Sequence, residues 1–197
     1  MTTTNDILNQ FHTIVGDETD LSSFEELELL NKVYNEILNT KKWEILKKED
    51  TGTLTGTEIN TPDDFTRLLD EPVIYLGENN KVFRVIPFSE RRIYKGQNNI
   101  VYYDARQSKF VFLKEQDDTY SYDYIYQPDA ITDSVIPVFP SRFWGLFPFF
   151  MASDNDFIQL MDKNRSYAEE NRLRGEMILN DMMAWNDDLT MMRIYGN

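Results

Sequence analysis

Residues 118–127 read DTYSYDYIYQ, which places a tyrosine at every second position: 120, 122, 124 and 126. Because the side chains of a β-strand alternate between its two faces, a strand here puts all four phenols on one side. Such a row can form one wall of a small core, since tyrosine is common in strands and packs well across them. It can also form a platform on which sugar rings stack. The sequence favours the core wall and leaves the sugar platform as the alternative.

The charge of the chain argues against nucleic acid as a ligand of this row. The 197 residues include 34 acidic and 20 basic side chains, for a net charge of −14. Aspartates at positions 117, 118, 123 and 129 flank the tyrosines. A stacking platform for DNA or RNA needs positive charge close by, and proteins that read nucleic-acid sequence are usually basic. We therefore expect no sequence-specific binding of nucleic acid.

The residue types needed for most catalytic and metal sites are scarce. The chain has no cysteine and a single histidine, His12, which excludes disulfides, thiolate nucleophiles and histidine-rich metal sites. Asp154 and Asp156, with Asn155 between them, suit the start of a calcium loop, but the glycine and the distal glutamate of such a loop are missing. We predict no catalytic residue, no metal and no cofactor.

Helical spacing marks both ends of the chain. Apolar residues recur every three or four positions within residues 1–48, where Thr4 and Ser23 are suited to cap two helices. The same spacing returns after residue 137, and Pro148 should kink that helix or end its first turn. We predict a further helix over about 165–185 and an extended tail over 187–197.

The middle of the chain, residues 49–136, has the pattern of an antiparallel β-domain. Short apolar or alternating runs cover residues 43–48, 73–76, 82–86, 100–103, 110–113 and 120–126. The connections at 78–81 and 104–108 look like hairpins, and residues 89–96 suit a short helix. The predicted fold is α+β, in which the N-terminal helices (1–48) and C-terminal helices (137–197) pack together as a helical bundle and the β-domain is inserted between them.

The hydropathy of the chain predicts no membrane segment. Its most apolar window, residues 143–152, is shorter than the roughly 18 residues of a membrane span. The first residues lack a basic region followed by an apolar stretch, so they do not read as a secretory signal. We expect a soluble protein that is synthesised in the cytoplasm.

The run after the tyrosines, YQPDAITDSVIPVFPSRFW at 126–144, resembles the segment that enters the closing helices of head-to-tail adaptor proteins of tailed phages. Three further features resemble the same family: LNKVYNEI at 30–37, followed by Trp43 and Leu46, and PDDFTRL at 62–68. Together these marks span about residues 24–185. The ring proteins of short-tailed and crAss-like phages look like the nearest relatives.

The resemblance implies a structural virion protein without catalytic activity. Many copies, usually twelve, form a ring beneath the portal, in the neck between capsid and tail, after synthesis in the host cytoplasm. The implied partners are other copies, the portal protein and a downstream tail or second ring protein, while genome DNA passes through an acidic channel that repels its phosphates. A carbohydrate-binding or adhesion module that uses the tyrosine face is the alternative.

Copies that repel one another through their net charge need opposite charges or apolar contacts where they meet. We predict that basic and methionine side chains supply these contacts. The candidate interface residues are Arg91, Arg92, Lys95, Arg165, Arg172, Arg174, Met177, Met182, Met183, Met191 and Met192.

Overall fold

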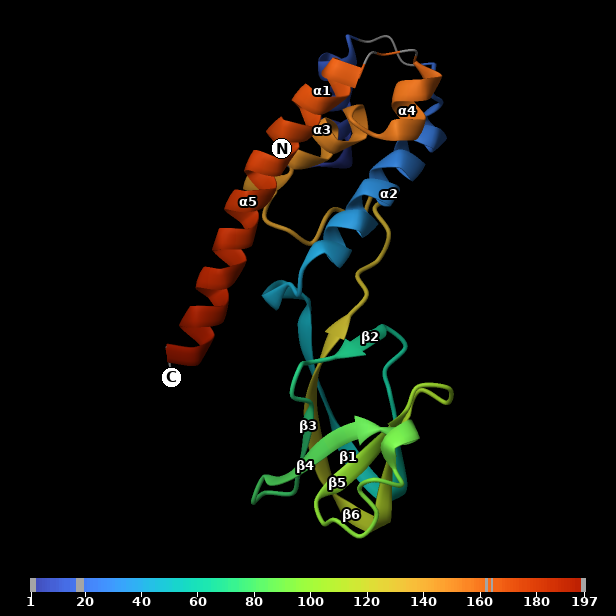
Figure 1. The fold of residues 1–197 in the computed structure, drawn as a ribbon, viewed down its shortest axis with the longest axis vertical. Coiled ribbons are helices and arrows are strands. Elements are labelled where there is room, and N and C mark those ends of the chain that lie inside the picture. Colours follow the sequence, from blue (N-terminus) through green and yellow to red (C-terminus); the bar gives the residue numbers. More distant parts are fainter. Residues whose placement is uncertain (1–2, 17–19, 162, 164, 196–197) are drawn as a thin grey trace. The chain divides into compact units, whose positions relative to one another are not determined.

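The structure, a computed structural model, describes residues 3–16, 20–161, 163 and 165–195 (Figure 1). For residues 193–195 it describes the backbone alone. It is a mixed α+β protein that divides into two compact units. Unit 1 consists of Met1–Ile45 and Asp129–Asn197, and unit 2 consists of Leu46–Pro128. Both ends of the chain thus belong to unit 1. The division falls after residues 45 and 128, whereas the sequence places the β-domain at 49–136.

The described helices of unit 1 are α1 (Thr4–Val15), α2 (Ser23–Thr40), α3 (Leu146–Ala152), α4 (Asn155–Leu160) and α5 (Arg165–Tyr195). Capping boxes start the first two of these helices, because the side chains of Thr3 and Ser22 accept hydrogen bonds from the backbone three residues later. Each cap lies one residue before the predicted one. Pro148 lies in the first turn of α3, where the N–H that proline lacks has no partner within the helix.

The predicted extended tail over 187–197 is wrong for the described residues, since α5 is one helix of 31 residues that ends at Tyr195. Between residues 176 and 195 the chain has neither glycine nor proline, so nothing breaks the helix. Asn186, a polar residue of this stretch, is buried. Its Oδ1 accepts the Glu44 N–H at 2.7 Å, and its amide nitrogen donates to the Lys42 carbonyl at 3.2 Å. These bonds hold α5 against the end of the N-terminal segment.

Aromatic rings from both ends of the chain meet inside unit 1. Phe11 and Phe157 lie with ring centroids 5.2 Å apart, and Trp43 and Phe139 lie 4.9 Å apart, both pairs edge to face. Trp43 is fully buried, and its Nε1 donates to the Ile37 carbonyl at 3.0 Å. Helix α5 comes close to α3 at Gly175, where an added Cβ would lie 3.2 Å from the Phe150 ring.

Unit 2 is a sheet of six strands. They are β1 (Lys47–Asn60), β2 (Phe65–Leu68), β3 (Val73–Leu76), β4 (Lys81–Pro87), β5 (Ile100–Asp104) and β6 (Lys109–Tyr126). Along the sheet the order is β1-β6-β3-β4-β5, and β5 also pairs with β6, so that β6, β3, β4 and β5 close on one another as a small barrel. Strand β2 pairs with the end of β6.

The predicted hairpins are confirmed and one predicted pairing direction is wrong. Turns connect β3 to β4 and β5 to β6, and both pairs are antiparallel. Strands β4 and β5, however, are parallel, so the sheet is not wholly antiparallel. The segment between them crosses over as a 3-10 helix, Phe88–Glu90, followed by turns, where the sequence suggests a short helix over 89–96. This crossover returns the chain to the starting end of β4, so β5 runs in the same direction.

Strand β1 is longer than predicted, and the predicted runs 110–113 and 120–126 belong to one strand, β6. Residues 51–57 of β1 read TGTLTGT and lack the apolar alternation of a strand. They are nevertheless paired with β6, and their one large apolar side chain, Leu54, is buried. The pairing shifts register between Gly56 and Glu58, and Gly56 has a φ of 109°, a conformation that favours glycine.

The tyrosine row faces the core of unit 2. The exposed fraction of Tyr122 is 2 %, Tyr124 is also buried, and the half-buried Tyr120 and Tyr126 pack against the same cluster. The Phe110 ring lies edge to face with Tyr122, with centroids 4.8 Å apart. The prediction that these tyrosines form a core wall is confirmed.

Candidate assembly surfaces

Burial of the tyrosine row removes it from the candidate binding surfaces. The Tyr124 hydroxyl donates to Asp64 at 2.8 Å. Burial is the larger cause and this carboxylate the smaller cause of a raised pKa of Tyr124. Burial likewise raises the pKa of Tyr122, with a further contribution from the nearby Asp50 carboxylate. The two central rings are packed among other core side chains, so their faces are not exposed at the surface.

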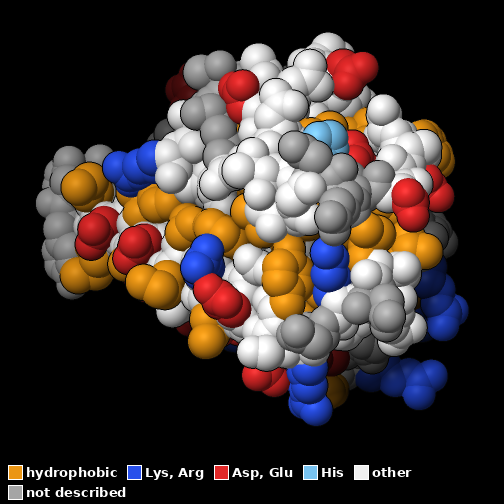
Figure 2. Space-filling view, turned by 90° about the horizontal axis from the view of Figure 1, so that it is seen from above, with side chains coloured by type: hydrophobic (Ala, Val, Ile, Leu, Met, Phe, Trp, Pro, Cys, Tyr) orange, Lys and Arg blue, Asp and Glu red, His pale blue; other side chains and the backbone are white. Residues whose placement is uncertain are grey.

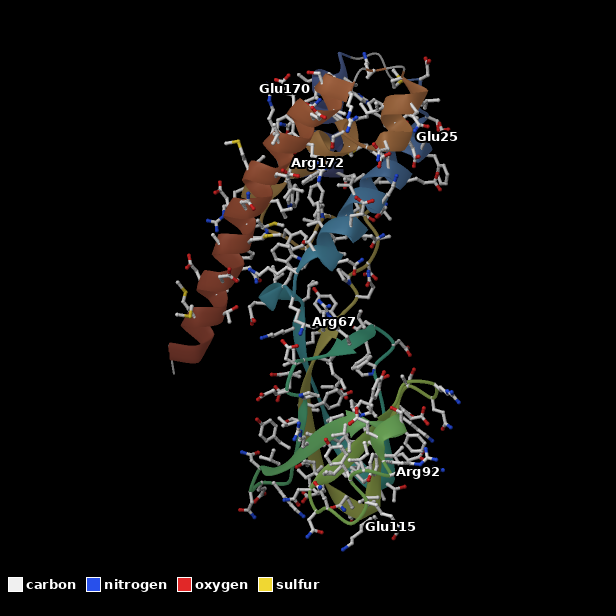
Figure 3. The ribbon with its side chains drawn as sticks, in the orientation of Figure 1. Glu25, Arg67, Arg92, Glu115, Glu170 and Arg172 are labelled. Atoms are coloured by element: carbon white, nitrogen blue, oxygen red, sulfur yellow. The ribbon has the colours of Figure 1, made fainter. Side chains whose placement is uncertain are left out.

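The basic cluster of Arg91, Arg92 and Lys95 lies on the turns that follow the 3-10 helix of unit 2. All three side chains are exposed, and Figure 3 labels Arg92. The Arg91 guanidinium lies 4.2 Å from the centroid of the Phe88 ring. Among the described residues, neither Arg92 nor Lys95 forms an ion pair, and the Ile93 side chain between them is largely exposed. The cluster is therefore accessible to a partner.

The predicted arginines of α5 are all exposed, and each bonds to a glutamate one turn away. Nε of Arg165 lies 3.3 Å from Glu169. The Arg172 pair with Glu176 measures 2.8 Å, and the Arg174 pair with Glu170 measures 2.6 Å. Figure 3 labels Arg172 and Glu170 on α5. Exposed pairs at this spacing stabilise a helix only slightly. These pairs leave the arginines exposed at the surface, where they contribute little to the stability of the fold.

The predicted methionines of α5 do not lie together. Met182 is fully buried in unit 1 and Met183 is partly buried, whereas Met177, Met191 and Met192 are exposed. Met182 is therefore a core residue, and the prediction that it contacts a neighbour is wrong. Helical geometry explains the difference, because positions 177 and 182 point in different directions around the axis.

An exposed apolar pair runs along α5. The exposed fractions of Leu173 and Met177, one turn apart, are 62 % and 69 %. Charged residues at the same helical spacing flank them. We call this set, Glu170, Leu173, Arg174, Met177 and Asp181, the α5 strip.

A hollow of about 290 Å³ lies between α2 and α4. Its apolar lining consists of Leu21, Leu29, Phe157 and Leu160, and its charged lining consists of Glu25, Glu28, Lys32, Asp154 and Asp156. Leu160 is 62 % exposed and the nearby Phe24 on α2 is 69 % exposed. We call this surface the α2–α4 hollow. Sequence patterns do not indicate it, because its apolar residues come from two segments far apart in the chain.

The charged side chains that line the hollow differ in the hydrogen bonds and ion pairs they form. Nζ of Lys32 lies 2.7 Å from Asp154 and 2.8 Å from Asp156, and the hydrogen bonds to these carboxylates raise the pKa of Lys32. Asp154 also caps α4, because its Oδ1 accepts the N–H of Asp156 at 3.0 Å. The exposed Glu28 has no such partner among the described residues. Asp154 and Asp156 therefore act as cap and ion-pair partners.

The described part of the chain contains no group of three or more histidine, cysteine, aspartate or glutamate side chains arranged to hold a metal ion. None of its helices is both long enough and apolar enough to cross a membrane. One face of the molecule shows hydrophobic side chains exposed among lysine, arginine, aspartate and glutamate (Figure 2).

No protein-family model matches the chain, and no curated protein matches its sequence. The structure is that of an α+β protein with several exposed apolar and charged surfaces.

Proposed function

We propose that this chain is a structural subunit of the head-to-tail connector of a tailed phage. Many copies, usually twelve in the proteins it resembles, would form a ring beneath the portal and offer a platform to later tail components. The observation that carries the proposal is the exposure of large apolar side chains at two places in unit 1: the α5 strip and the α2–α4 hollow. Apolar groups grouped among charges on a folded surface mark sites of protein contact.

The proposal includes a helical bundle built from both chain ends. It is supported by the contacts of Phe11 with Phe157 and of Trp43 with Phe139, and by the bonds from Asn186 to the backbone of Lys42 and Glu44. Contacts of this kind join segments more than 90 residues apart into one rigid unit. A ring subunit needs a rigid fold, because small errors in orientation add up around a ring.

The charge distribution suits a channel through which DNA passes. Residues 1–45 and 129–197 carry 20 acidic and 9 basic side chains, while residues 46–128 carry 14 and 11. Carboxylates facing a channel repel the phosphates of the genome, so DNA can move without being bound. The proposed location is the neck of the virion, and the proposed partners are other copies, the portal protein and a downstream tail or second ring protein.

The test is binding to the portal protein encoded with this chain. The purified full chain, alone and mixed with portal rings, is analysed by size-exclusion chromatography with light scattering and by electron microscopy. We expect a discrete complex in which a ring of this chain sits at one end of the portal. A stable monomer that ignores the portal and binds glycans would contradict the proposal and favour the adhesion module.

A further inference from the structure

We propose that the free edge of strand β1 binds an extended basic segment of a partner protein, which joins the sheet of unit 2 as a further strand. The site consists of the backbone and side chains of Glu49, Thr51, Thr53 and Thr55, which we call the β1 edge. It lies within unit 2 and is present whether or not the chain belongs to a connector.

Strand β1 is paired on one side only. From Lys47 to Asn60 its partner is β6. In the part of the chain that the structure describes, no other strand pairs with β1, whereas β6 also pairs with β2, β3 and β5. Strand β1 is therefore an edge strand, and half of its backbone groups have no partner in a ladder.

The neighbours of β6 show which backbone groups of β1 point away from the sheet. Strands β1 and β3 both pair with Ser121, so they lie on opposite sides of β6. The Thr119 carbonyl accepts the N–H of Gly77, just after β3, at 2.9 Å, so it points away from β1. Residues opposite each other in an antiparallel pair both turn their backbone groups inward or both outward. Thr53 stands opposite Thr119, so its N–H and C=O point to the free edge.

The other three residues of the β1 edge share this orientation. They stand at alternate positions of β1 in the same unshifted register with β6. Each of the four therefore turns one N–H and one C=O outward. Among the residues that the structure describes, no loop, helix or side chain bonds to these groups. They are available to the backbone of a further strand.

The β1 edge lacks the usual protection of an exposed strand. Proline, lysine or a bulge commonly prevents an edge from pairing with another chain. Residues 49–55 read EDTGTLT and contain neither proline nor lysine, and the register shift comes after them, between Gly56 and Glu58. The four side chains of the β1 edge are exposed, whereas Leu54 is buried in the core of unit 2. An added strand would thus find backbone partners without a rearrangement of the core.

The charges on the exposed face favour a basic segment. Glu49 is exposed and stands opposite Asp123 of β6, and like charges opposite each other destabilise a sheet. Asp117 stands opposite Thr55 further along. At the alternate positions of β1 and β6 that share this register, Lys47 is the one basic residue and three are acidic. A lysine or arginine of the added strand beside Glu49 would offset the repulsion.

A synthetic peptide tests the site. The probe is a short fluorescent peptide of alternating threonine and valine with a lysine at each end, added to the full chain and followed by fluorescence anisotropy. We expect it to bind, and the same peptide with glutamate at its ends should bind at least tenfold more weakly. A lysine peptide N-methylated at every central residue should not bind, because it cannot donate backbone hydrogen bonds. Failure of the parent peptide to bind, or equal binding of the methylated one, would overturn the inference.

Substitutions in β1 locate the bound peptide. Thr53→Pro removes an outward N–H and no bond to β6, so the variant should fold and bind the lysine peptide at least tenfold more weakly. Thr53→Val keeps this N–H and is the matched control, with a change below twofold. Glu49→Lys should weaken binding of the lysine peptide and strengthen binding of the glutamate peptide. Circular dichroism checks the fold of each variant, and undiminished binding by Thr53→Pro would place the peptide elsewhere.

Hydrogen exchange on the parent chain gives a reading that does not depend on any variant. The amides of Thr51 and Thr53 should exchange rapidly in the free chain and slowly with the lysine peptide bound. Slow exchange in the free chain, with self-association that Thr53→Pro abolishes, would show that a second copy occupies the edge and would overturn the inference. These measurements need no portal protein, so their failure is distinct from failure of the connector role.

Discussion

Nε2 of His12 on α1 lies 2.6 Å from Oε1 of Glu26 on α2, and only 5 % of the Glu26 side chain is exposed. This bond joins the first two helices through a carboxylate that has lost nearly all its contact with water. A buried carboxylate is costly unless a donor reaches it. The single histidine of the chain thus has a structural partner, which the sequence pattern does not reveal.

We expect His12→Ala to lower the free energy of unfolding by about 1–3 kcal/mol, the usual cost of leaving a buried polar group without its partner. Urea unfolding at neutral pH measures the loss. The double variant His12→Ala/Glu26→Leu should recover part of it, because both polar groups are then gone. A loss as small as that of an exposed substitution would show that Glu26 finds water instead.

The cost in stability of replacing a tyrosine of this row should depend on how deeply its position is buried. We expect Tyr122→Ala to cost about 3–5 kcal/mol, as for other emptied aromatic sites in a core. Tyr126→Ala, at a half-buried position of the same row, should cost clearly less. Tyr122→Phe should be nearly neutral, because the Tyr122 hydroxyl is buried without a hydrogen bond of regular geometry among the described residues. Thermal or urea unfolding of the three variants ranks them; a large loss in Tyr122→Phe would contradict this account.

Stability at acidic pH should depend on Asp64. Lys48, at 2.5 Å, and the Tyr124 hydroxyl, at 2.8 Å, hold the pKa of Asp64 below its ordinary value. A carboxyl with a lower pKa in the folded state adds stability above its unfolded pKa of about 4, and this stability is lost as the pH falls through the folded value. We expect Asp64→Asn to be less stable than the parent at pH 7, by less than about 1 kcal/mol because the pair is partly exposed. The gap should narrow as the pH falls below the unfolded value and should close below the folded one, and a gap that persists in acid would refute the ion pair as its cause.

Two carboxylates that share one lysine should differ in importance. Asp154 caps α4 and is largely buried, whereas Asp156 is exposed and its carboxylate binds, among the described residues, only the Lys32 ammonium. We expect Asp154→Ala to lower unfolding free energy by about 1–2 kcal/mol, as for the loss of a helix cap. Asp156→Ala is the matched control and should stay within about 0.5 kcal/mol. Similar losses in both variants would show that Lys32, rather than the cap, determines the effect.

Two truncations at the end of α5 should separate its contribution to folding from its contribution to portal binding. Removal of residues 186–197 deletes Asn186 and its bonds to the backbone of Lys42 and Glu44, so it should destabilise unit 1. Removal of residues 191–197 keeps Asn186 and should leave the unfolding midpoint nearly unchanged while weakening attachment to the portal. Urea unfolding and portal binding of both truncations measure the two effects. Normal portal binding by the shorter deletion would show that the end of α5 has no docking role.

Periodicity in the sequence predicts what depends on neighbours along the chain. Four tyrosines at every second position predict a strand with one buried face, and Tyr122 and Tyr124 confirm it. The two hairpins and the helical ends follow equally from turn residues and apolar spacing. Strands and helices have fixed repeats, so a few residues suffice to indicate which face is buried.

Contacts between distant segments are decided only in the tertiary structure. Residues 51–57 form a strand because β6 provides backbone partners for them, and β5 runs parallel to β4 because it closes the sheet on β6. Helix α5 lies against the N-terminal segment at Asn186, because the side chain of Asn186 bonds to the backbone of Lys42 and Glu44. The α2–α4 hollow likewise exists only where Leu29 and Phe157 come together. Hydrogen bonds and apolar contacts of this kind join separate segments of the chain, and no local repeat encodes them.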